Sequence, residues 1–423
     1  MVSGCSGASV EDLLSPPRLD GEQTEIYAAL RAFTNDSITL KYPRSGQYRS
    51  AFVIKDIDDE PTDEAIVFYE MPNVSSGTSL RMNFLDKQDG KWVSVYDLAA
   101  SGSEVESILF TDFGDGAVTI LVNYLVQSSS DRSTSVMTYK DGIPSELVSI
   151  RNIYTDIFDA DGNGTDDLFA ISTERALGIT SASIYGRNRD KFTLIGATNL
   201  NSGFAEIRKV TCGTCSASGT RGIFIDYASS DGSYSTDAIV YNDRNFLLSP
   251  AVTPASIVRS SNSYTPYIDC RDPDNDGCIE IPVTVPFMQY EGSPHSEQLC
   301  ETVWYTLNRN GTEIIRKFGS FVGTKGDYIL LFPAVWSGKV TASASISEGI
   351  IKFNRYNSIS GITEDSLLKL YGAPEGGSER YENSDEYIPL GTSSSTGWSY
   401  YAQLGTGPLV PTEAELKQMF RLQ

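Results

Sequence analysis

An all-β fold is the class that this 423-residue sequence predicts, on three observations. Glycine, tyrosine and phenylalanine are abundant, at 36, 23 and 18 residues, which favours strands joined by tight turns. Polar turn pairs such as Asp89-Gly90 follow short aromatic-bearing strands, as in β-hairpins. The same order of acidic loop, apolar strand and hairpin also recurs along the chain, which indicates a repeated unit.

The segment before the repeats resembles a lipoprotein start. Residues 1–5, Met-Val-Ser-Gly-Cys, end in a tetrad similar to a bacterial lipobox, whose Cys is lipidated after signal-peptide cleavage. Residues 6–18 are small and polar with two prolines, which is typical of a spacer. No run of 18 apolar residues occurs, as a membrane-spanning helix needs. We therefore expect a secreted, extracytoplasmic protein, lipid-anchored to the cell membrane through Cys5, with a flexible linker over residues 1–19.

Two short helices are predicted near the ends of the folded part. Asp20 begins one and Thr412 the other, each followed three residues later by Gln or Glu, as in a capping box. Apolar residues follow each cap at helical spacing: Ile26, Leu30 and Phe33 in the first helix, and Leu416, Met419 and Phe420 in the last.

Three acidic loops, each running directly into an apolar strand, define the repeat. They begin at Asp56, Asp159 and Asp272. Hairpin turns recur at intervals of about 50 residues. A unit of this size with four short strands matches one blade of a β-propeller. The turns are Asp89-Gly90, Asp141-Gly142, Arg189-Asp190, Asp243-Arg244 and Asn310-Gly311.

The repeats predict a β-propeller of about seven four-stranded blades, with a strand near residues 38–42 helping to close the ring. Two units have lost the acidic pattern: residues 112–116 keep a remnant, and residues 212–215 stand where a loop is expected. Residues 20–322 form the repeat region. Residues 323–423 are either the last blades or a separate C-terminal α+β module, in which case the propeller region has five blades.

The Asp159 loop has the spacing of a calcium site. Calcium takes six to eight oxygen ligands, which a tight loop supplies from alternate residues. A glycine at the sixth position, Gly164, allows the sharp turn. The expected ligands are Asp159, Asp161, Asn163, the Thr165 carbonyl and Asp167, and in the second loop Asp272, Asp274, Asp276, Cys278 and Glu280.

Two other kinds of loop have similar acidic patterns. An EF-hand needs a carboxylate at position twelve, where Ala170 and Val283 stand instead, so a loop that leads into a strand is favoured. An acidic turn capped by its own backbone is the other alternative. In the Asp56 loop, Pro61 replaces the turning glycine and Glu60 a shorter side chain, so we expect this loop to hold no metal.

These loops, repeated at blade spacing over roughly residues 40–320, resemble the FG-GAP or VCBS-type calcium loops of integrin-like β-propellers. The whole chain resembles repeat lipoproteins of Gram-positive gut bacteria. The resemblance implies a propeller with calcium in its blade loops and an adhesive or carbohydrate-related role at the cell surface. It does not imply a defined ligand.

Cysteine usage favours an oxidising, extracytoplasmic location. Cys270 and Cys278 flank the second loop, and Cys212 and Cys215 span the missing one, so all four are candidates for structural disulfides. Cys300 competes for the same partners. A redox motif or a zinc site at residues 212–215 ranks lower, because the βαβ setting and the further ligands are lacking.

The sequence assigns no catalytic residue. Its one histidine, His295, stands in a polar loop without a nucleophile motif around it. A net charge of -22 disfavours nucleic acid as a partner. We expect a non-catalytic module that binds or scaffolds a glycan or a protein. A glycan-cleaving enzyme with paired carboxylates and a purely structural envelope protein remain alternatives. Four tryptophans are either core residues or sugar-stacking platforms: Trp92, Trp304, Trp336 and Trp398.

Overall fold

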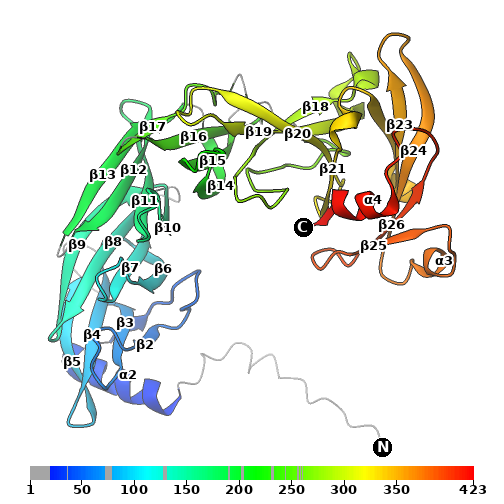
Figure 1. The fold of residues 1–423 in the computed structure, drawn as a ribbon. Coiled ribbons are helices and arrows are strands. Elements are labelled where there is room, and N and C mark those ends of the chain that lie inside the picture. Colours follow the sequence, from blue (N-terminus) through cyan, green and yellow to red (C-terminus); the bar gives the residue numbers. More distant parts are fainter. Residues whose placement is uncertain are drawn as a thin grey trace, which may run out of the picture. The chain divides into compact units, whose positions relative to one another are not determined.

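The computed structural model describes residues 20–423 except 36, 72–78, 127–130, 189–190, 202–203, 230–232, 243, 255–256, 258 and 260. Strands dominate these residues and form six antiparallel sheets of four or five strands (Figure 1). The all-β prediction is therefore confirmed. The expected number of about seven blades is not confirmed, since the described residues form six sheets.

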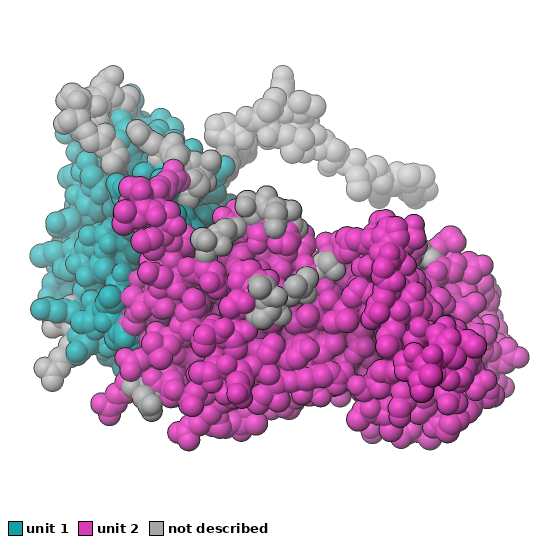
Figure 2. Space-filling view, turned by 90° about the horizontal axis from the view of Figure 1, so that it is seen from above, with its two compact units in different colours: residues 1–157, 165–173, 185–195 teal, residues 158–164, 174–184, 196–423 magenta. Residues whose placement is uncertain are grey.

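The chain divides into two compact units, which Figure 2 colours teal and magenta. Unit 1 consists of Met1–Ile157, Thr165–Thr173 and Tyr185–Ile195. Unit 2 consists of Phe158–Gly164, Glu174–Ile184 and Gly196–Gln423. Each unit contains its own apolar cores between successive sheets.

Unit 1 contains two complete sheets. In the first, β3 pairs with β4 on one side and with both β1 and β2 on the other, and β4 pairs with β5. The second has the order β6-β7-β8-β9. Side chains such as Phe68, Phe84 and Tyr124 fill the core between these sheets. The strands are β1 (Thr39–Leu40), β2 (Phe52–Lys55), β3 (Glu64–Glu70), β4 (Leu80–Gln88), β5 (Lys91–Ala99), β6 (Glu104–Thr111), β7 (Thr119–Leu125), β8 (Arg132–Lys140) and β9 (Ile143–Asn152).

The third sheet has the order β10-β11-β12-β13, and the boundary between the units runs through it. Within unit 1, Phe113, Leu121 and Val136 pack against Leu168 and Phe192. Its strands are β10 (Tyr154–Phe158), β11 (Asp167–Glu174), β12 (Ile179–Asn188) and β13 (Lys191–Asn199).

Unit 2 contains three further sheets, in the orders β14-β15-β16-β17, β18-β19-β20-β21-β27 and β22-β23-β24-β26-β25. Phe224 and Leu307 belong to the core between the first two, and Phe321 and Phe353 to the core between the last two. The strands are β14 (Phe204–Thr214), β15 (Arg221–Ser229), β16 (Tyr234–Asn242), β17 (Asn245–Leu248), β18 (Ile281–Pro286), β19 (Cys300–Leu307), β20 (Ile314–Val322), β21 (Tyr328–Leu331), β22 (Val340–Ser345), β23 (Ile350–Asn357), β24 (Ile362–Ala373), β25 (Ile388–Thr392), β26 (Ser399–Leu404) and β27 (Phe420–Leu422).

The central strands of these sheets are buried on both faces. Along β3, six consecutive residues from Glu64 are buried, whereas in β5 at the sheet edge eight of the nine residues are exposed or half-buried. Buried runs in central strands and partly exposed edge strands are the pattern expected when sheets pack face to face.

Both predicted end helices are present. In α2 (Gly21–Thr34), the Asp20 side chain accepts a hydrogen bond of 2.7 Å from Gln23 N. In α4 (Glu413–Met419), Thr412 and Glu415 form the full capping box. Two details are wrong: Phe33 in the last turn of α2 is 49% exposed, because the buried contacts come from its earlier turns, and Phe420 begins β27 instead of ending the helix. The structure also contains α3 (Glu379–Glu382) and four short 3-10 helices: η1 (Met288–Tyr290), η2 (His295–Glu297), η3 (Ala334–Trp336) and η4 (Ile346–Glu348).

The hairpin predictions hold wherever the structure describes the turn. Asp89 and Gly90 join β4 to β5 with φ of 52° and 76°, and Asp141 and Gly142 join β8 to β9 with 51° and 79°. Positive φ at both central residues is the type I′ hairpin geometry. Arg189, Asp190 and Asp243 lie outside the described residues.

The first and last strands, β1 and β27, do not form the pairing that was expected to close a ring. β1 pairs with β3 inside the first sheet, because β1 and the short β2 share one edge of β3, so this strand does not close a ring. The last strand, β27, pairs with β21. The expected division at 322/323 falls between β20 and β21, which pair with each other. No helix in the described ranges has the length and apolarity to cross a membrane, and Cys5 lies outside those ranges.

Candidate metal-binding loops

The three acidic loops occupy matching places before buried strands. The Asp56 loop joins β2 to β3, the Asp159 loop joins β10 to β11, and the Asp272 loop leads into β18. The remnant at Asp112 joins β6 to β7 in the same way. In all four loops the residue after the first Asp is buried, and it anchors the start of the loop; these residues are Ile57, Phe113, Ala160 and Pro273.

The first aspartate of each loop caps the backbone that follows. Asp56 Oδ1 accepts a hydrogen bond from Asp59 N at 2.9 Å, and Asp159 Oδ1 accepts one from Gly162 N at 2.7 Å. Asp112 in the remnant accepts three such bonds. These bonds form an Asx-type turn and do not distinguish a metal loop from a simple acidic turn.

The ninth residue of each intact loop is a buried acidic residue, which a simple acidic turn does not require. Glu64, Asp167 and Glu280 are 1%, 2% and 0% exposed. In the remnant loop the ninth residue is Ile120, also 0% exposed. The fold therefore accepts an apolar side chain at this buried position, and burying a carboxylate there is costly unless a cation or hydrogen bonds compensate it.

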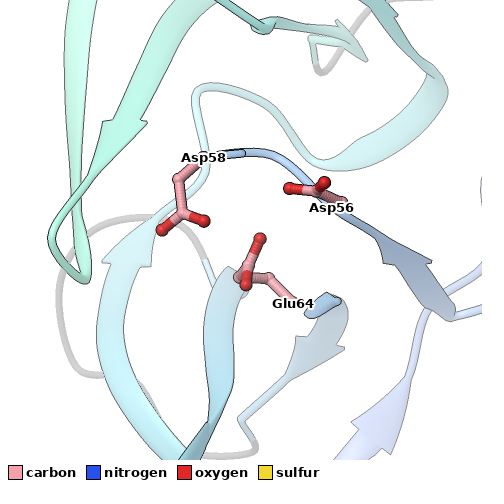
Figure 3. Close-up of side chains that lie close together, drawn as sticks. All are labelled: Asp56, Asp58 and Glu64. Carbon is pink, nitrogen blue, oxygen red and sulfur yellow. The ribbon is translucent and has the colours of Figure 1, made fainter. Parts of the chain in front are cut away.

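In each loop, carboxylate oxygens from three residues lie within 4.8 Å of one another: Asp56, Asp58 and Glu64; Asp159, Asp161 and Asp167; and Asp272, Asp274 and Asp276. Figure 3 shows the first cluster, in which the carboxyl groups of Asp58 and Glu64 face each other with Asp56 beside them. Such convergence of hard oxygen ligands suits a calcium ion.

The Asp56 cluster has no basic partner among the described residues. Within the described ranges, no Lys or Arg forms an ion pair with Asp56, Asp58 or Glu64. One oxygen of Glu64, Oε2, accepts a hydrogen bond of 2.9 Å from Ile57 N. Burial raises the pKa of Glu64 to about 7, and the negative charges of Asp58, Asp86 and Asp56 add to the effect. The site therefore has an excess of negative charge that a divalent cation can neutralise.

The Asp272 cluster does have a basic partner. Lys317 on β20 places its Nζ 3.0 Å from Asp274 Oδ2, 2.7 Å from Asp276 Oδ2 and 2.7 Å from Glu280 Oε1. Burial by itself lowers the pKa of Lys317, but the hydrogen bonds to three carboxylates outweigh burial and raise this pKa overall. Burial raises the pKa of Glu280 to about 8 despite the nearby ammonium.

The structure places the remaining expected ligands in their loops. Asn163 donates from its backbone N to Asp159 Oδ1 and Asp161 Oδ1, each at 3.1 Å. Thr165 lies two residues before Asp167 in the same loop. Cys278 donates from its backbone N to Asp276 Oδ1 at 2.9 Å.

The Asp56 loop shows a feature that its turn residues do not predict. The substitutions at positions five and six argued against a metal, yet the structure brings Asp56, Asp58 and Glu64 together. The available signal was Glu64, an acidic residue directly before an apolar strand, at the same position as Asp167 and Glu280. Lys317 was missed because no local pattern marks it.

None of the expected disulfides is formed. Cys215, Cys270, Cys278 and Cys300 are free thiols. Cys270 is fully buried beside the ion pair of Arg259 and Asp226, and its Sγ donates to Asp226 Oδ1 at 3.2 Å. Burial raises the pKa of Cys270 well above its usual range, so this thiol is held protonated within a polar network.

The structure places His295 on the surface and three of the four tryptophans in cores. His295 is exposed in η2, with Nε2 3.3 Å from the Ser261 carbonyl oxygen. Trp92, Trp304 and Trp336 are buried in cores. Trp398 is half-buried and lines a pocket in unit 2.

No family model and no curated protein sequence matches this chain. Among solved structures, it is similar to a provisionally assigned 6-phosphogluconolactonase from Bacteroides uniformis, with 12% identity, a TM-score of 0.29, and coverage of 77% of this chain and 94% of that one. It is also similar to the rhamnogalacturonan lyase YesW, with 12% identity, a TM-score of 0.31, and coverage of 89% of this chain and 64% of that one. At these TM-scores neither likeness carries a functional argument, so function has to be inferred from this chain's own residues.

Proposed function

We propose that this protein is a calcium-stabilised β-repeat module that binds a glycan or a protein at the cell surface without catalysing a reaction. The observation that carries the proposal is the buried acidic residue at position nine of three loops, which in the Asp56 and Asp159 loops lies in a cluster with two further carboxylates. In the remnant loop the same position holds Ile120, so the charge is a feature of the intact loops and not a requirement of the fold. Calcium is the cation that such all-oxygen loops accept.

The sequence patterns support three more specific proposals, which concern the propeller, the calcium loops and the lipid anchor. The repeats form a propeller of about seven blades with FG-GAP or VCBS-type loops, and the Asp159 and Asp272 loops bind calcium together with the Asp56 loop. Cys5 carries a lipid that anchors the protein outside the cytoplasmic membrane. Calcium affinity in the range of about 10⁻⁴ to 10⁻³ M is usual for extracellular modules.

We place the ligand site at the pocket around Trp398. The indole lies against the sheet backbone, because an added Cβ at Gly372 would meet Trp398 Cε3 at 3.1 Å. Lys325 Nζ stands 4.1 Å from the ring centroid. Thr324, Ser345 and Tyr371 add polar groups to the lining. A half-buried aromatic ring with polar neighbours is a suitable platform for the apolar face of a sugar ring.

The rival function, a glycan-cleaving enzyme, needs two carboxyl groups about 5 to 9.5 Å apart beside the bound sugar. None of the residues that line the Trp398 pocket is acidic, and all of them are described. This favours binding over hydrolysis at that pocket.

A glycan array combined with a hydrolysis screen tests the ligand assignment. We expect the unaltered protein to bind a glycan, Trp398→Ala to lose at least tenfold in affinity, and no glycan to be cleaved. The matched control is Tyr96→Ala, which removes a 39%-exposed aromatic side chain from β5 in unit 1 and leaves binding unchanged. Reproducible cleavage of a polysaccharide would favour the enzyme, and equal losses in both variants would remove Trp398 from the site.

A further inference from the structure

We propose that Lys317 is a built-in competitor for calcium at the Asp272 loop, so that a calcium ion binds there only by displacing the lysine ammonium. The inference rests on the calcium binding proposed above and adds a residue that sets the metal affinity of one loop. It predicts that the three acidic loops differ in affinity, although their carboxylate patterns are alike.

Lys317 reaches the loop from a distant part of the chain. It lies on β20, whereas Asp274 and Glu280 lie 43 and 37 residues earlier. Its ammonium group has three donors, and carboxylates of three different residues accept them. The ammonium therefore stands among the oxygens that a calcium ion would use.

The ammonium group of Lys317 neutralises only part of the negative charge of the Asp272 loop. Asp272, Asp274, Asp276 and Glu280 carry four negative charges when ionised, against one positive charge on Lys317. Glu280 is fully buried, and its Oε2 has no hydrogen-bond partner among the described residues. A divalent ion with six to eight ligands can engage oxygens that one ammonium leaves unsatisfied.

Lys317 can leave the loop without unfolding it. Its side chain is 22% exposed, and a lysine carries its charge on a flexible four-carbon stem that can extend towards water. The Asp56 cluster forms no such ion pair within the described ranges, so calcium has no tethered competitor there. We therefore expect the Asp272 loop to bind calcium more weakly than the Asp56 loop.

The test isolates the Asp272 loop in the full-length chain. The substitutions Asp58→Asn and Asp161→Asn weaken the other two loops, and Lys317→Met is then added to this background. Calcium chloride is titrated into both proteins in an isothermal calorimeter, after chelator treatment. We expect Lys317→Met to tighten calcium binding at least tenfold, and Lys317→Gln, which is less disruptive, to act in the same direction. Unchanged or weaker binding in the folded Lys317 variants would overturn the inference.

The matched control is Arg316→Met, which removes the neighbouring basic side chain on β20. Arg316 pairs with Glu301 and not with the loop, so this control leaves calcium affinity unchanged. An equal gain in the control would show a general charge effect and would overturn the role of Lys317. If the unaltered protein binds calcium at the other loops while the Lys317 variants gain nothing, only this inference falls. If the unaltered protein binds no calcium at any loop, the proposed function falls with it.

Discussion

At the scale of single residues, the buried acidic side chain at the ninth loop position gives the strongest support for the proposed metal binding. Two unit charges 4 Å apart repel by about 4 kcal/mol at the effective dielectric constant of a protein surface. In the Asp56 and Asp159 loops, three carboxylates, one of them buried, have oxygens within 4.8 Å of one another, which is therefore unfavourable without a cation. The raised pKa of Glu64, caused first by burial and then by its acidic neighbours, is the same effect seen on one group.

The change Glu64→Gln separates the proposed role of this residue in metal binding from its role in packing. The amide keeps the size of the side chain but removes the charge, so we expect calcium affinity at the Asp56 loop to fall at least tenfold. In chelator, the melting temperature should stay the same or rise, because a buried negative charge is removed. Calorimetry and thermal melts measure the two effects.

Asp63→Asn is the matched control for Glu64→Gln. Asp63 is the exposed acidic neighbour of Glu64 and does not belong to the carboxylate cluster. It should leave calcium binding within twofold of the unaltered protein. If Glu64→Gln behaves like this control, position nine is not a ligand.

At the scale of elements, type I′ hairpins join the third and fourth strands of the repeat. The turn between β4 and β5 and the turn between β8 and β9 both combine a positive-φ Asp with a positive-φ Gly. The mirror-image turn matches the right-handed twist of the flanking strands. It also fixes the register, because Gln88 pairs with Lys91 and Lys140 with Ile143.

Gly90→Ala should destabilise the protein by about 1 to 2 kcal/mol, because a side chain at φ of 76° is strained even though an added Cβ would meet no atom within 4 Å. Urea denaturation followed by circular dichroism measures the change. Gly21→Ala is the control, since Gly21 begins α2 without positive φ or close neighbours. That change should be neutral or stabilising, and equal losses at both positions would refute the turn argument.

At the scale of the whole molecule, the sequence predicts those structural features that residues close together in the chain determine. Strand positions, both end helices and the described hairpin turns follow from local patterns, such as Thr412 with Glu415 or Asp89 with Gly90. The pairing of β1 with β3 joins residues about thirty positions apart and leaves no local signal. The contact of Lys317 with the Asp272 loop leaves no local signal for the same reason, and the expectation for the Asp56 loop rested on its turn residues and not on its buried ninth residue.

The buried pair of Arg259 and Asp226 is another feature that only the folded chain reveals. Asp226 Oδ1 accepts from Arg259 at 2.8 Å, and Asp226 Oδ2 accepts from Cys270 N at 2.7 Å. These contacts tie the segment that enters the Asp272 loop to β15. Cys270 and Cys278, which were expected to form a disulfide across that loop, are free. The hydrogen bonds and the ion pair of Asp226 hold the chain at Cys270, just before the loop begins.

Calcium-dependent thermal melting of the unaltered protein tests the central claim most directly. We expect millimolar calcium to raise the melting temperature by several degrees relative to chelator, because binding to the folded state alone stabilises it by mass action. A variant carrying Asp58→Asn, Asp161→Asn and Asp274→Asn should melt at the same temperature in calcium and in chelator. An unaltered protein whose melting temperature does not move between calcium and chelator would contradict the account.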